Sequence, residues 1–360
     1  MLIEKTETYN VLGVMSGTSL DGLDLAFAKF TRSENWRFEI VRTVTLPYSL
    51  FWQRRLSEAI NLPKRELNTL DKEYTRYLAK AIKNFIAENQ ITNLDAICSH
   101  GHTVLHQPHK GITVQIGNRP KLAKLTGQRV ICDFRVQDVK LGGQGAPLVP
   151  IGDALLFGNY DACINLGGFA NISYNSAGKR IAYDICPVNV VLNHYAQQLG
   201  LNYDRGGEVA STHKVHSILR QELNRLPFYK SAPPKSLGME WVNKEVLPIL
   251  ERRKLSPARK ISTYTEHISE QIAKALNLQK NLKNGKILIT GGGSFNSYLM
   301  ECIAYKTHAE LVIPEDNLVE YKEALIFGLL GVLRLRNSVN ILKSVTGASR
   351  DHCAGLIYTP

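Results

Sequence analysis

The sequence lacks the features that mark membrane-spanning, secreted or disulfide-bonded proteins. Its longest apolar run is residues 324–333, whereas a helix that crosses a bilayer needs about 20 residues. No basic-then-apolar pattern typical of a signal peptide stands at the N-terminus. The six cysteines are scattered and form no C-x-x-C pair, which predicts buried, reduced thiols. We therefore expect a cytoplasmic protein with no membrane partner, in which residues 324–333 form a buried helix.

Positive charge is in excess but is not concentrated anywhere. The chain has 44 Lys and Arg against 32 Asp and Glu, a formal charge of +12. These basic residues are spread along the whole length, without an arginine-rich arm or a basic stripe interleaved with aromatics. The pattern disfavours nucleic acid as a partner, and it suits an anionic small molecule such as ATP.

Length and periodicity predict an α/β protein. The chain has 360 residues, 44% of them apolar, and no low-complexity segment, which is enough for two domains. Helical periodicity is visible over 67–89, 188–199 and 263–276. Short apolar runs at 96–99, 129–132 and 286–290 read as strands. Alternation of the two element types favours parallel or mixed sheets.

No segment matches the P-loop or the G-x-G-x-x-G motif, but three glycine-rich turns follow predicted strands. The first, residues 13–24, lies between strands at 11–14 and 25–30. The second, 166–173, lies between strands at 161–165 and 180–184, and the third, 291–293, leads from strand 286–290 into a helix from 294. Glycines allow positive φ and let backbone N–H groups approach a ligand. Taken alone, the first turn could equally be an ordinary Gly/Ser/Asp turn.

Two hairpin turns and one strand–glycine–helix turn resemble the nucleotide cleft of the actin/sugar-kinase superfamily. There, two related domains each supply a phosphate hairpin, and the second adds an adenosine loop. The hairpins stand roughly 150 positions apart, which suggests a structural duplication. We expect a two-domain, ribonuclease H-like α/β fold with the nucleotide cleft between the domains.

Several polar residues at predicted strand ends could carry chemistry. Asp184 ends the strand after the second hairpin, where a carboxylate can accept a proton from a nucleophile, or it could simply be a solvated or capping residue. Asp133 and Arg135 follow another strand and could instead form an internal ion pair. Glu323 opens the apolar helix, where it could orient a substrate or only complement the helix dipole. Lys235 stands in a proline-rich turn that could meet an anionic ligand.

Four histidines crowd the segment 99–109, at positions 100, 102, 106 and 109. Their spacing could suggest a metal site, but no cysteine or carboxylate interleaves them. The segment looks like a strand followed by a loop. We expect hydrogen bonding to a polar ligand, or to the loop itself, rather than a transition metal.

Taken together, these motifs resemble the anhydro-N-acetylmuramic acid kinase family over nearly the whole chain. The resemblance implies a cytoplasmic, homodimeric enzyme of peptidoglycan recycling. It would open the 1,6-anhydro ring with water, move the γ-phosphate of ATP to O6, and yield N-acetylmuramic acid 6-phosphate. The segments that carry it are 15–22, 99–103, 115–117, 133–135, 142–148, 165–168, 171–173, 233–236, 291–293, 323–325 and 345–348.

The resemblance also implies roles for individual residues. Asp184 would be the general base, and Arg135 and Glu323 would position substrate or water. Mg²⁺ would be held through water by Asp21 and Asp24. ATP would be bound by Gly17, Thr18, Ser19, Leu20, Asp21, Gly22, Leu23, Asp24, Gly167, Gly168, Asn171, Gly291, Gly292 and Gly293. The amino sugar would be bound by His102, Thr103, Gln115 and Asp133.

The expected domains follow from these assignments. Domain one would be residues 1–135 with 325–360, carrying the first phosphate hairpin and part of the sugar site. Domain two would be residues 136–324, carrying the second hairpin, the catalytic aspartate and the adenosine loop. The Gly- and Pro-rich segment 142–147 would lie between domains.

One departure from the family pattern bears on the substrate. Where the family commonly reads Asp-Thr-Gly-Pro-Gly-Asn, residues 184–189 read Asp-Ile-Cys-Pro-Val-Asn. The bulkier Ile185, Cys186 and Val188 are expected to reshape the sugar pocket. Another sugar kinase of the superfamily, or a catalytically silent nucleotide-gated sugar sensor, is the alternative. A chaperone-like or filament-forming ATPase ranks last.

Overall fold

The chain forms two compact units in a computed structural model that describes residues 6–17 and 19–360. Unit 1 comprises Met1–Leu156 with Tyr321–Pro360, and unit 2 comprises Phe157–Glu320. The sequence placed these divisions after residues 135 and 324. Segment 142–147 therefore lies inside unit 1. The function assigned to each domain stays a prediction.

Unit 1 is built on a mixed sheet with the strand order β12-β6-β4-β1-β2-β3, and β5 pairs with β4. β1, β2 and β3 are antiparallel neighbours, whereas β4 runs parallel to both β1 and β6. The strands are β1 (Glu7–Ser16), β2 (Gly22–Arg32), β3 (Trp36–Pro47), β4 (Ala96–Gln107), β5 (Ile112–Ile116), β6 (Val130–Cys132) and β12 (Leu356–Tyr358).

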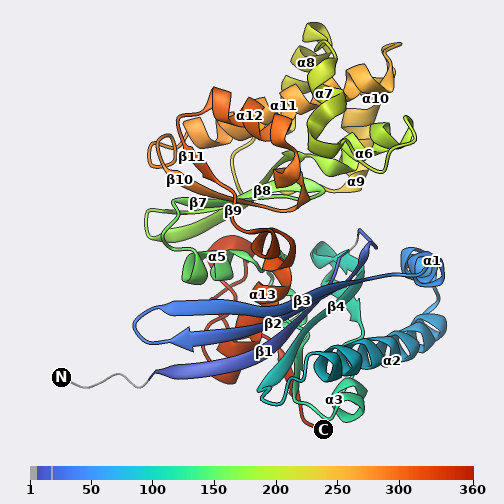
Figure 1. Cartoon of the computed structure of the whole chain (residues 1–360), viewed down its shortest axis with the longest axis vertical. Coiled ribbons are helices and arrows are strands. Elements are labelled where there is room, and N and C mark those ends of the chain that lie inside the picture. The colour runs from blue at the N-terminus through green and yellow to red at the C-terminus, as the bar shows by residue number, and fades with distance from the viewer. Residues whose placement is uncertain (1–5, 18) are drawn as a thin grey trace. The chain divides into compact units, whose positions relative to one another are not determined.

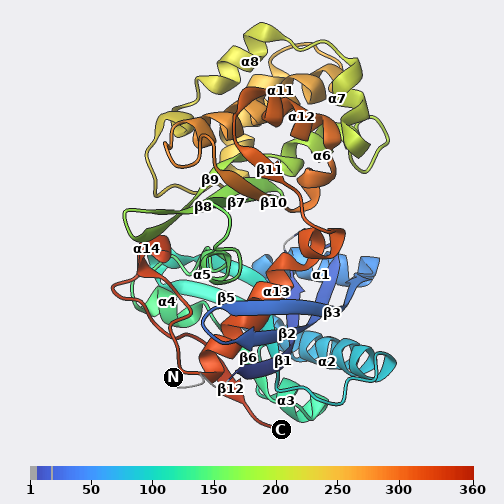
Figure 2. The same ribbon diagram turned by 60° about the vertical axis from the view of Figure 1, so that its left-hand side comes forward.

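Helices cover both faces of this sheet. Alternate residues of β1 point to opposite faces, so Leu12 packs in the cluster that includes α2, while Gly13 lies against α13. A side chain on Gly13 would overlap the carbonyl of Ala324, so glycine permits this close approach. Figure 2 shows α13 crossing the strands of the sheet. The helices are α1 (Leu50–Glu58), α2 (Lys64–Glu88), α3 (Lys121–Thr126), α4 (Val136–Lys140), α5 (Pro150–Leu156), α13 (Asp316–Leu335, in unit 1 from Tyr321) and α14 (Lys343–Thr346).

Unit 2 has a smaller sheet with the order β11-β10-β7-β8-β9, and its helices pack on it around the long α11 (Figure 1). Tyr264 of α11 is fully buried in this core. The strands are β7 (Ala162–Leu166), β8 (Phe169–Ser176), β9 (Lys179–Pro187), β10 (Lys286–Thr290) and β11 (Glu310–Val312). The helices are α6 (Asn189–Gln197), α7 (Glu208–Thr212), α8 (Ser217–Asn224), α9 (Met239–Trp241), α10 (Leu247–Glu251), α11 (Pro257–Asn277) and α12 (Ser297–Lys306).

The two sheets repeat one topology. In unit 1 the path β3-β2-β1-β4-β6 has three antiparallel strands followed by two parallel ones, and in unit 2 the path β9-β8-β7-β10-β11 does the same. The hairpins β1–β2 and β7–β8 occupy equivalent places. This confirms the predicted duplication and the ribonuclease H-like fold of the sugar-kinase type.

Three local expectations are wrong. β4 continues to Gln107, so residues 100–107 are strand and not loop, with Gly101 at φ +74°. α13 begins at Asp316, so Glu323 lies inside the helix and not at its N-terminal end. Asp184 lies within β9, which continues to Pro187.

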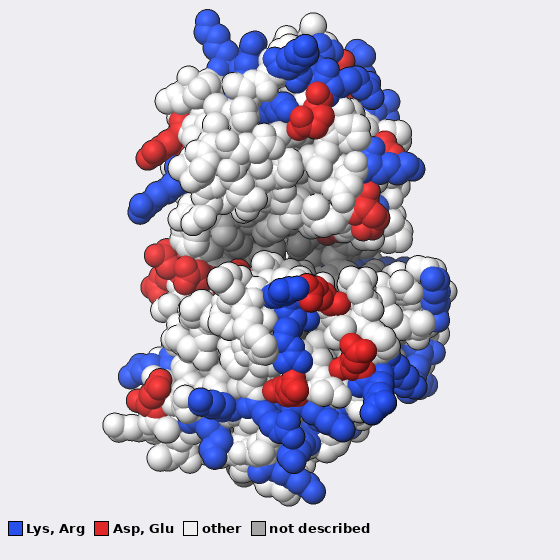
Figure 3. Space-filling model, turned by 90° about the vertical axis from the view of Figure 1, so that its right-hand side faces the viewer, with Lys and Arg blue, Asp and Glu red and all other residues white. Residues whose placement is uncertain are grey.

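The expected buried helix is confirmed, and the expected burial of the cysteines is confirmed for four of the six. Residues 324–333 are buried within α13. The six cysteines are all free, and four of them are buried. Lys and Arg side chains are spread over the face shown in Figure 3, with Asp and Glu among them. In the described part of the chain, no helix combines the length and apolar character needed to cross a membrane.

Candidate active site

The first glycine-rich turn connects β1 to β2 and is ordered by its own polar groups. Asp21 Oδ1 accepts hydrogen bonds from Ser19 Oγ at 2.8 Å and from Gly22 N at 2.9 Å. Leu20 has φ +60° and its side chain packs against the core beside the buried Leu23. Leu23, which is fully buried, can therefore offer a ligand only its backbone groups, whereas Leu20 is half-buried. Thr18 lies outside the described residues.

Gly17 and Gly22 of this turn have different surroundings. A Cβ on Gly22 would come within 2.7 Å of the Leu46 carbonyl, so Gly22 is required by the packing of β3. Among the described residues, a Cβ on Gly17 would meet Ser19 Oγ at 3.0 Å and Ser19 N at 3.9 Å. The close contact at Gly17 thus comes from the end of one exposed side chain, and not from the backbone of a neighbouring strand as at Gly22.

Carboxylates gather near this turn. Asp24 Oδ1 accepts a hydrogen bond from Thr45 Oγ1 at 2.7 Å. Glu323 is exposed on α13, and its carboxyl interacts electrostatically with Asp24, Asp21 and Arg135. Among the described residues there is no group of three His, Cys, Asp or Glu side chains that could enclose a metal. Two carboxylates fit Mg²⁺, which keeps several waters and is usually held by one or two carboxylates together with substrate phosphates.

The buried His100 pairs with the half-buried Arg135. Arg135 Nε donates to His100 Nε2 at 2.9 Å, and His100 Nδ1 lies 2.8 Å from the Gly101 carbonyl. Burial and the neighbouring Arg135 hold the pKa of His100 well below its usual range. His100 is therefore neutral, with its proton on Nδ1 and its Nε2 accepting from the guanidinium.

His102 ends a buried chain of hydroxyls that sequence reasoning missed. Ser16 Oγ lies 2.9 Å from His102 Nδ1 and 2.8 Å from Tyr48 Oη, and Tyr48 Oη lies 2.6 Å from Tyr74 Oη. Burial lowers the pKa of His102 to about 4, so this histidine is neutral near pH 7. The serine of the first turn was visible in the sequence, but no local pattern connects it to the tyrosines.

The other predicted sugar-binding residues lie on neighbouring elements of unit 1. Gln115 of β5 donates from Nε2 to Thr113 at 2.8 Å and to Thr103 at 3.4 Å. Its Oε1 is buried without a hydrogen-bond partner, an arrangement that calls for a donor from elsewhere. Asp133 follows β6 at φ +61°, and burial raises the pKa of its carboxyl.

Asp184 in unit 2 is held by a segment that lies about fifty residues further along the chain. Its Oδ2 accepts a hydrogen bond from Leu237 N at 2.8 Å, and its own N–H donates to the Lys235 carbonyl at 3.1 Å. Lys235 Nζ donates to the Phe228 carbonyl at 3.1 Å and lies 4.6 Å from that ring's centroid. The sequence left open whether Lys235 meets an anionic ligand or stands in a rigid turn. In the structure its side chain packs against aromatic rings and its backbone carbonyl holds Asp184.

The environment of Asp184 makes its carboxyl a stronger base than an ordinary aspartate. Burial raises its pKa from 3.8 to about 6, and the hydrogen bond from Leu237 opposes part of this rise. A carboxyl with this pKa is largely ionised at neutral pH and accepts a proton more readily than one in water. Asn171 lies opposite Asp184 in the β8–β9 ladder.

The two glycine turns of unit 2 pack against each other. A Cβ on Gly291 would meet Asn165 at 2.6 Å, and one on Gly293 would meet the Leu166 carbonyl at 2.9 Å, next to the Gly167–Gly168 turn. Gly292 between them has open space on its Cβ side. The structure thus brings Gly167, Gly168, Asn171, Asp184, Gly291, Gly292 and Gly293 onto unit 2. Unit 1 carries the described remainder: Gly17, Ser19, Leu20, Asp21, Gly22, Leu23, Asp24, His102, Thr103, Gln115, Asp133, Arg135 and Glu323.

Comparison with known proteins shows the family of the chain. The chain matches the family model of anhydro-N-acetylmuramic acid kinase over residues 9–360. The chain belongs to the anhydro-N-acetylmuramic acid kinase family. A relative with that name from Saccharophagus degradans is 33% identical over 370 residues, covering 97% of this chain and 98% of the relative. Another from Pseudomonas fluorescens is 34% identical over 366 residues, covering 96% and 98%.

Solved structures that resemble the chain have much lower sequence identity than these relatives. Component A of (R)-2-hydroxyglutaryl-CoA dehydratase from Acidaminococcus fermentans has a TM-score of 0.45 at 12% identity. The match covers 89% of this chain and 96% of that one.

The three residues after Asp184 that depart from the anhydro-N-acetylmuramic acid kinase pattern are buried. Ile185 is 4% exposed, and Cys186 and Val188 are fully buried in the core of unit 2. Their side chains therefore pack inward, against the expectation that they reshape a sugar pocket. Pro187 and Asn189, which the pattern retains, stay close to the hairpin, because Asn189 Nδ2 donates to the Leu166 carbonyl at 3.4 Å.

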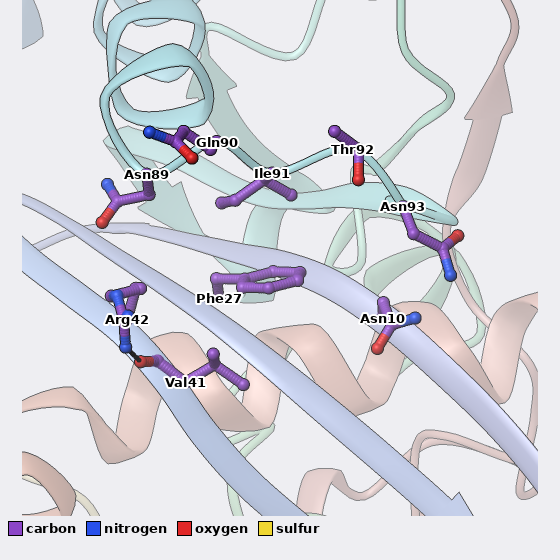
Figure 4. Close-up of a pocket in the computed structure, with 9 residues that line it drawn as sticks. All are labelled: Asn10, Phe27, Val41, Arg42, Asn89, Gln90, Ile91, Thr92 and Asn93. Carbon is purple, nitrogen blue, oxygen red and sulfur yellow. Dashed lines mark hydrogen bonds between the residues drawn. The ribbon is translucent and has the colours of Figure 1, made fainter.

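A separate hollow in unit 1 contains none of the predicted site residues. It has a volume of about 270 Å³ and lies between β2, β3 and the segment after α2 (Figure 4). Four of its nine lining residues carry amide side chains. The lining residues are Asn10, Phe27, Val41, Arg42, Asn89, Gln90, Ile91, Thr92 and Asn93.

Proposed function

We propose that this protein is an ATP-dependent kinase of 1,6-anhydro-N-acetylmuramic acid that acts in peptidoglycan recycling. It opens the anhydro ring by hydrolysis and phosphorylates O6, which gives N-acetylmuramic acid 6-phosphate. The observation that carries the proposal is Asp184, a carboxylate with a pKa of about 6 on the strand that follows a glycine hairpin. Membership of the anhydro-N-acetylmuramic acid kinase family supplies the substrate.

Asp184 acts as the general base in this proposal. Its carboxylate takes a proton from a water molecule as the water oxygen bonds to the anomeric carbon of the sugar. The bond from that carbon to O6 breaks, and O6 forms a bond to the γ-phosphorus while ADP leaves. The proton on Asp184 then passes to solvent, so each turnover consumes one water and one ATP.

The glycine turns bind the nucleotide in this proposal. Their exposed backbone N–H groups receive phosphate oxygens at Gly17 and at Gly167–Gly168, while 291–293 receives the adenosine part. Asp21 and Asp24 would hold Mg²⁺ through water, and the ion would neutralise charge on the phosphate groups. Phosphoryl transfer depends chiefly on such positioning and charge neutralisation.

The polar residues of unit 1 orient the sugar in this proposal. Arg135 and Glu323 form an electrostatically coupled pair that can bind hydroxyl or carboxylate groups or hold the attacking water. The unpartnered Gln115 Oε1 accepts from an amide or hydroxyl of the ligand. His102, Thr103 and Asp133 complete the set. We further propose that the enzyme is a cytoplasmic homodimer.

A coupled assay of ADP release tests the proposal. The protein is incubated with ATP, Mg²⁺ and, in turn, anhydro-N-acetylmuramic acid, N-acetylmuramic acid, N-acetylglucosamine and glucose. We expect ADP release that depends on the anhydro sugar. Turnover of only an ordinary sugar would make the protein another sugar kinase, and binding without turnover would make it a nucleotide-gated sensor. Either outcome would overturn the proposed reaction.

A further inference from the structure

Asp138 is a fully buried carboxylate in unit 1 that joins two segments far apart in the sequence. Its Oδ2 accepts a hydrogen bond from Gly145 N at 2.6 Å, and its Oδ1 accepts one from Thr346 Oγ1 at 2.7 Å. His352 Nε2 lies 3.6 Å from Oδ1. A buried carboxylate is costly unless donors surround it. These donors therefore fix the C-terminal segment against the loop after α4.

The loop 142–147 is pinned through successive backbone amides. Gly143 N donates to the Asp138 carbonyl at 2.9 Å, and Gln144 N donates to the Thr346 carbonyl at 2.8 Å. A side chain at Gly143 would overlap the Asp138 carboxylate, and Gly145 has φ +67°. Gly143 is therefore required by its contact with Asp138, and Gly145 by its positive φ and by a 2.9 Å approach to the Val139 side chain.

The pinned loop in turn holds the guanidinium of Arg135. Arg135 Nη1 donates to the Gly145 carbonyl at 2.6 Å, and its Nε donates to His100 Nε2 at 2.9 Å. Gly145 thus bonds Asp138 through its N–H and Arg135 through its carbonyl. A shift of this one residue would move one of the two points that fix the guanidinium.

We propose that Asp138 and Thr346 are positioning residues that set the orientation of Arg135 toward the sugar. This inference rests on the proposed function, because Arg135 is there a substrate-orienting residue. In this role neither Asp138 nor Thr346 needs to touch the reacting atoms. The C-terminal segment therefore contributes to the sugar site from a distance, through the path Thr346, Asp138, Gly145 and Arg135.

The test compares three variants with the wild type. Thr346→Val removes the hydroxyl at nearly constant volume, and Thr346→Ser keeps it. Thr75→Val is the matched control, since Thr75 is equally buried in unit 1 and its Oγ1 also makes a 2.7 Å bond, to the Asp71 carbonyl. For each variant, kcat, KM for anhydro-N-acetylmuramic acid, KM for ATP and the melting temperature are measured.

We expect Thr346→Val to lower kcat/KM for the sugar by about 10- to 100-fold, the range that a misplaced binding group produces. KM for ATP should change by less than about twofold, Thr346→Ser should restore most of the loss, and Thr75→Val should leave the kinetic constants unchanged. If Thr346→Val matches Thr75→Val, or if Thr346→Ser fails to rescue, the inference is overturned and the proposed function stands. If the wild type has no sugar-dependent turnover, the proposed function fails and this inference fails with it.

Discussion

Replacing Asp184 by Asn should make the protein more stable and nearly inactive at the same time. Burial raises the pKa of this carboxyl from 3.8 to about 6, so the folded state holds an ionised group in an unfavourable place at neutral pH. Asn keeps the shape and can still accept the hydrogen bond from Leu237, but it has no charge. As a base is lost, turnover should fall by about 10²- to 10⁴-fold.

The size of the stability change follows from the pKa. Well below pH 3.8 the carboxyl is protonated in both the folded and the unfolded state, so its burial as an anion does not lower the free energy of unfolding. As the pH rises, the carboxyl of Asp184 ionises first in the unfolded state. The resulting loss of unfolding free energy therefore grows with pH until the pH passes about 6, where the carboxyl ionises in the folded state too. With these two pKa values, the cost is about 1.6 kcal/mol at pH 5 and about 3 kcal/mol at pH 8. Asp184→Asn should therefore gain about 1.4 kcal/mol more at pH 8 than at pH 5.

Urea unfolding at pH 5 and pH 8 measures this difference. Asp161→Asn is the matched control, because Asp161 also accepts one backbone hydrogen bond in unit 2, from Lys286 N at 2.7 Å, but is exposed. The control should show no gain that grows with pH. A variant Asp184→Asn that is less stable than the wild type at pH 8, or whose gain is the same at both pH values, would refute the reasoning.

Three further substitutions test other parts of the site. Gly17→Val should weaken ATP binding by about tenfold or more in calorimetry in a protein that still folds, because the close contact of this Cβ is with Ser19 Oγ, the end of an exposed side chain that can turn away. An unchanged affinity would show that Gly17 is not part of the nucleotide site. Leu237→Pro removes the N–H that lowers the pKa of Asp184. In the pH profile of kcat/KM, the fall in activity toward acid, expected near pH 6 in the wild type, should therefore move to higher pH. If it does not move, this fall is not caused by protonation of Asp184. Ile185→Val should lower the free energy of unfolding by about 0.5–1.5 kcal/mol and leave the preference among sugars unchanged, since Ile185 is in the core. A changed preference would show that Ile185 does shape the sugar pocket.

The sequence predicted best those features that depend on short-range patterns. The strand over Lys286–Thr290 has the predicted bounds, and all three glycine-rich turns follow strands, because β-branched runs and glycines act locally. The repeated strand order could be inferred only through the resemblance, since strand pairing joins distant segments. The α/β class followed from the alternation of elements.

What could not be predicted depends on contacts between distant residues. α13 begins at Asp316, eight residues before the apolar run. The sequence did not reveal this start because polar residues prevail in the first turns of the helix and hide the hydrophobic pattern. β4 passes through Gly101 at φ +74°, which looks like a break in sequence but is accommodated by its neighbouring strands. The bond from Leu237 to Asp184 spans 53 positions. Segment 142–147 looked like a connection between domains, whereas it lies inside unit 1 and its Gly143 is required by a contact with the buried carboxylate of Asp138.

The composition of the reaction product tests the central claim most directly. The protein is incubated with ATP, Mg²⁺ and anhydro-N-acetylmuramic acid, and the sugar product is analysed by mass spectrometry and by NMR of its phosphorus. The account predicts a single product that has gained one phosphoryl group and one water, with the phosphate on O6 and one ADP formed for each sugar consumed. A product that gains the phosphoryl group without water, or ADP formed without any change in the sugar, would contradict it.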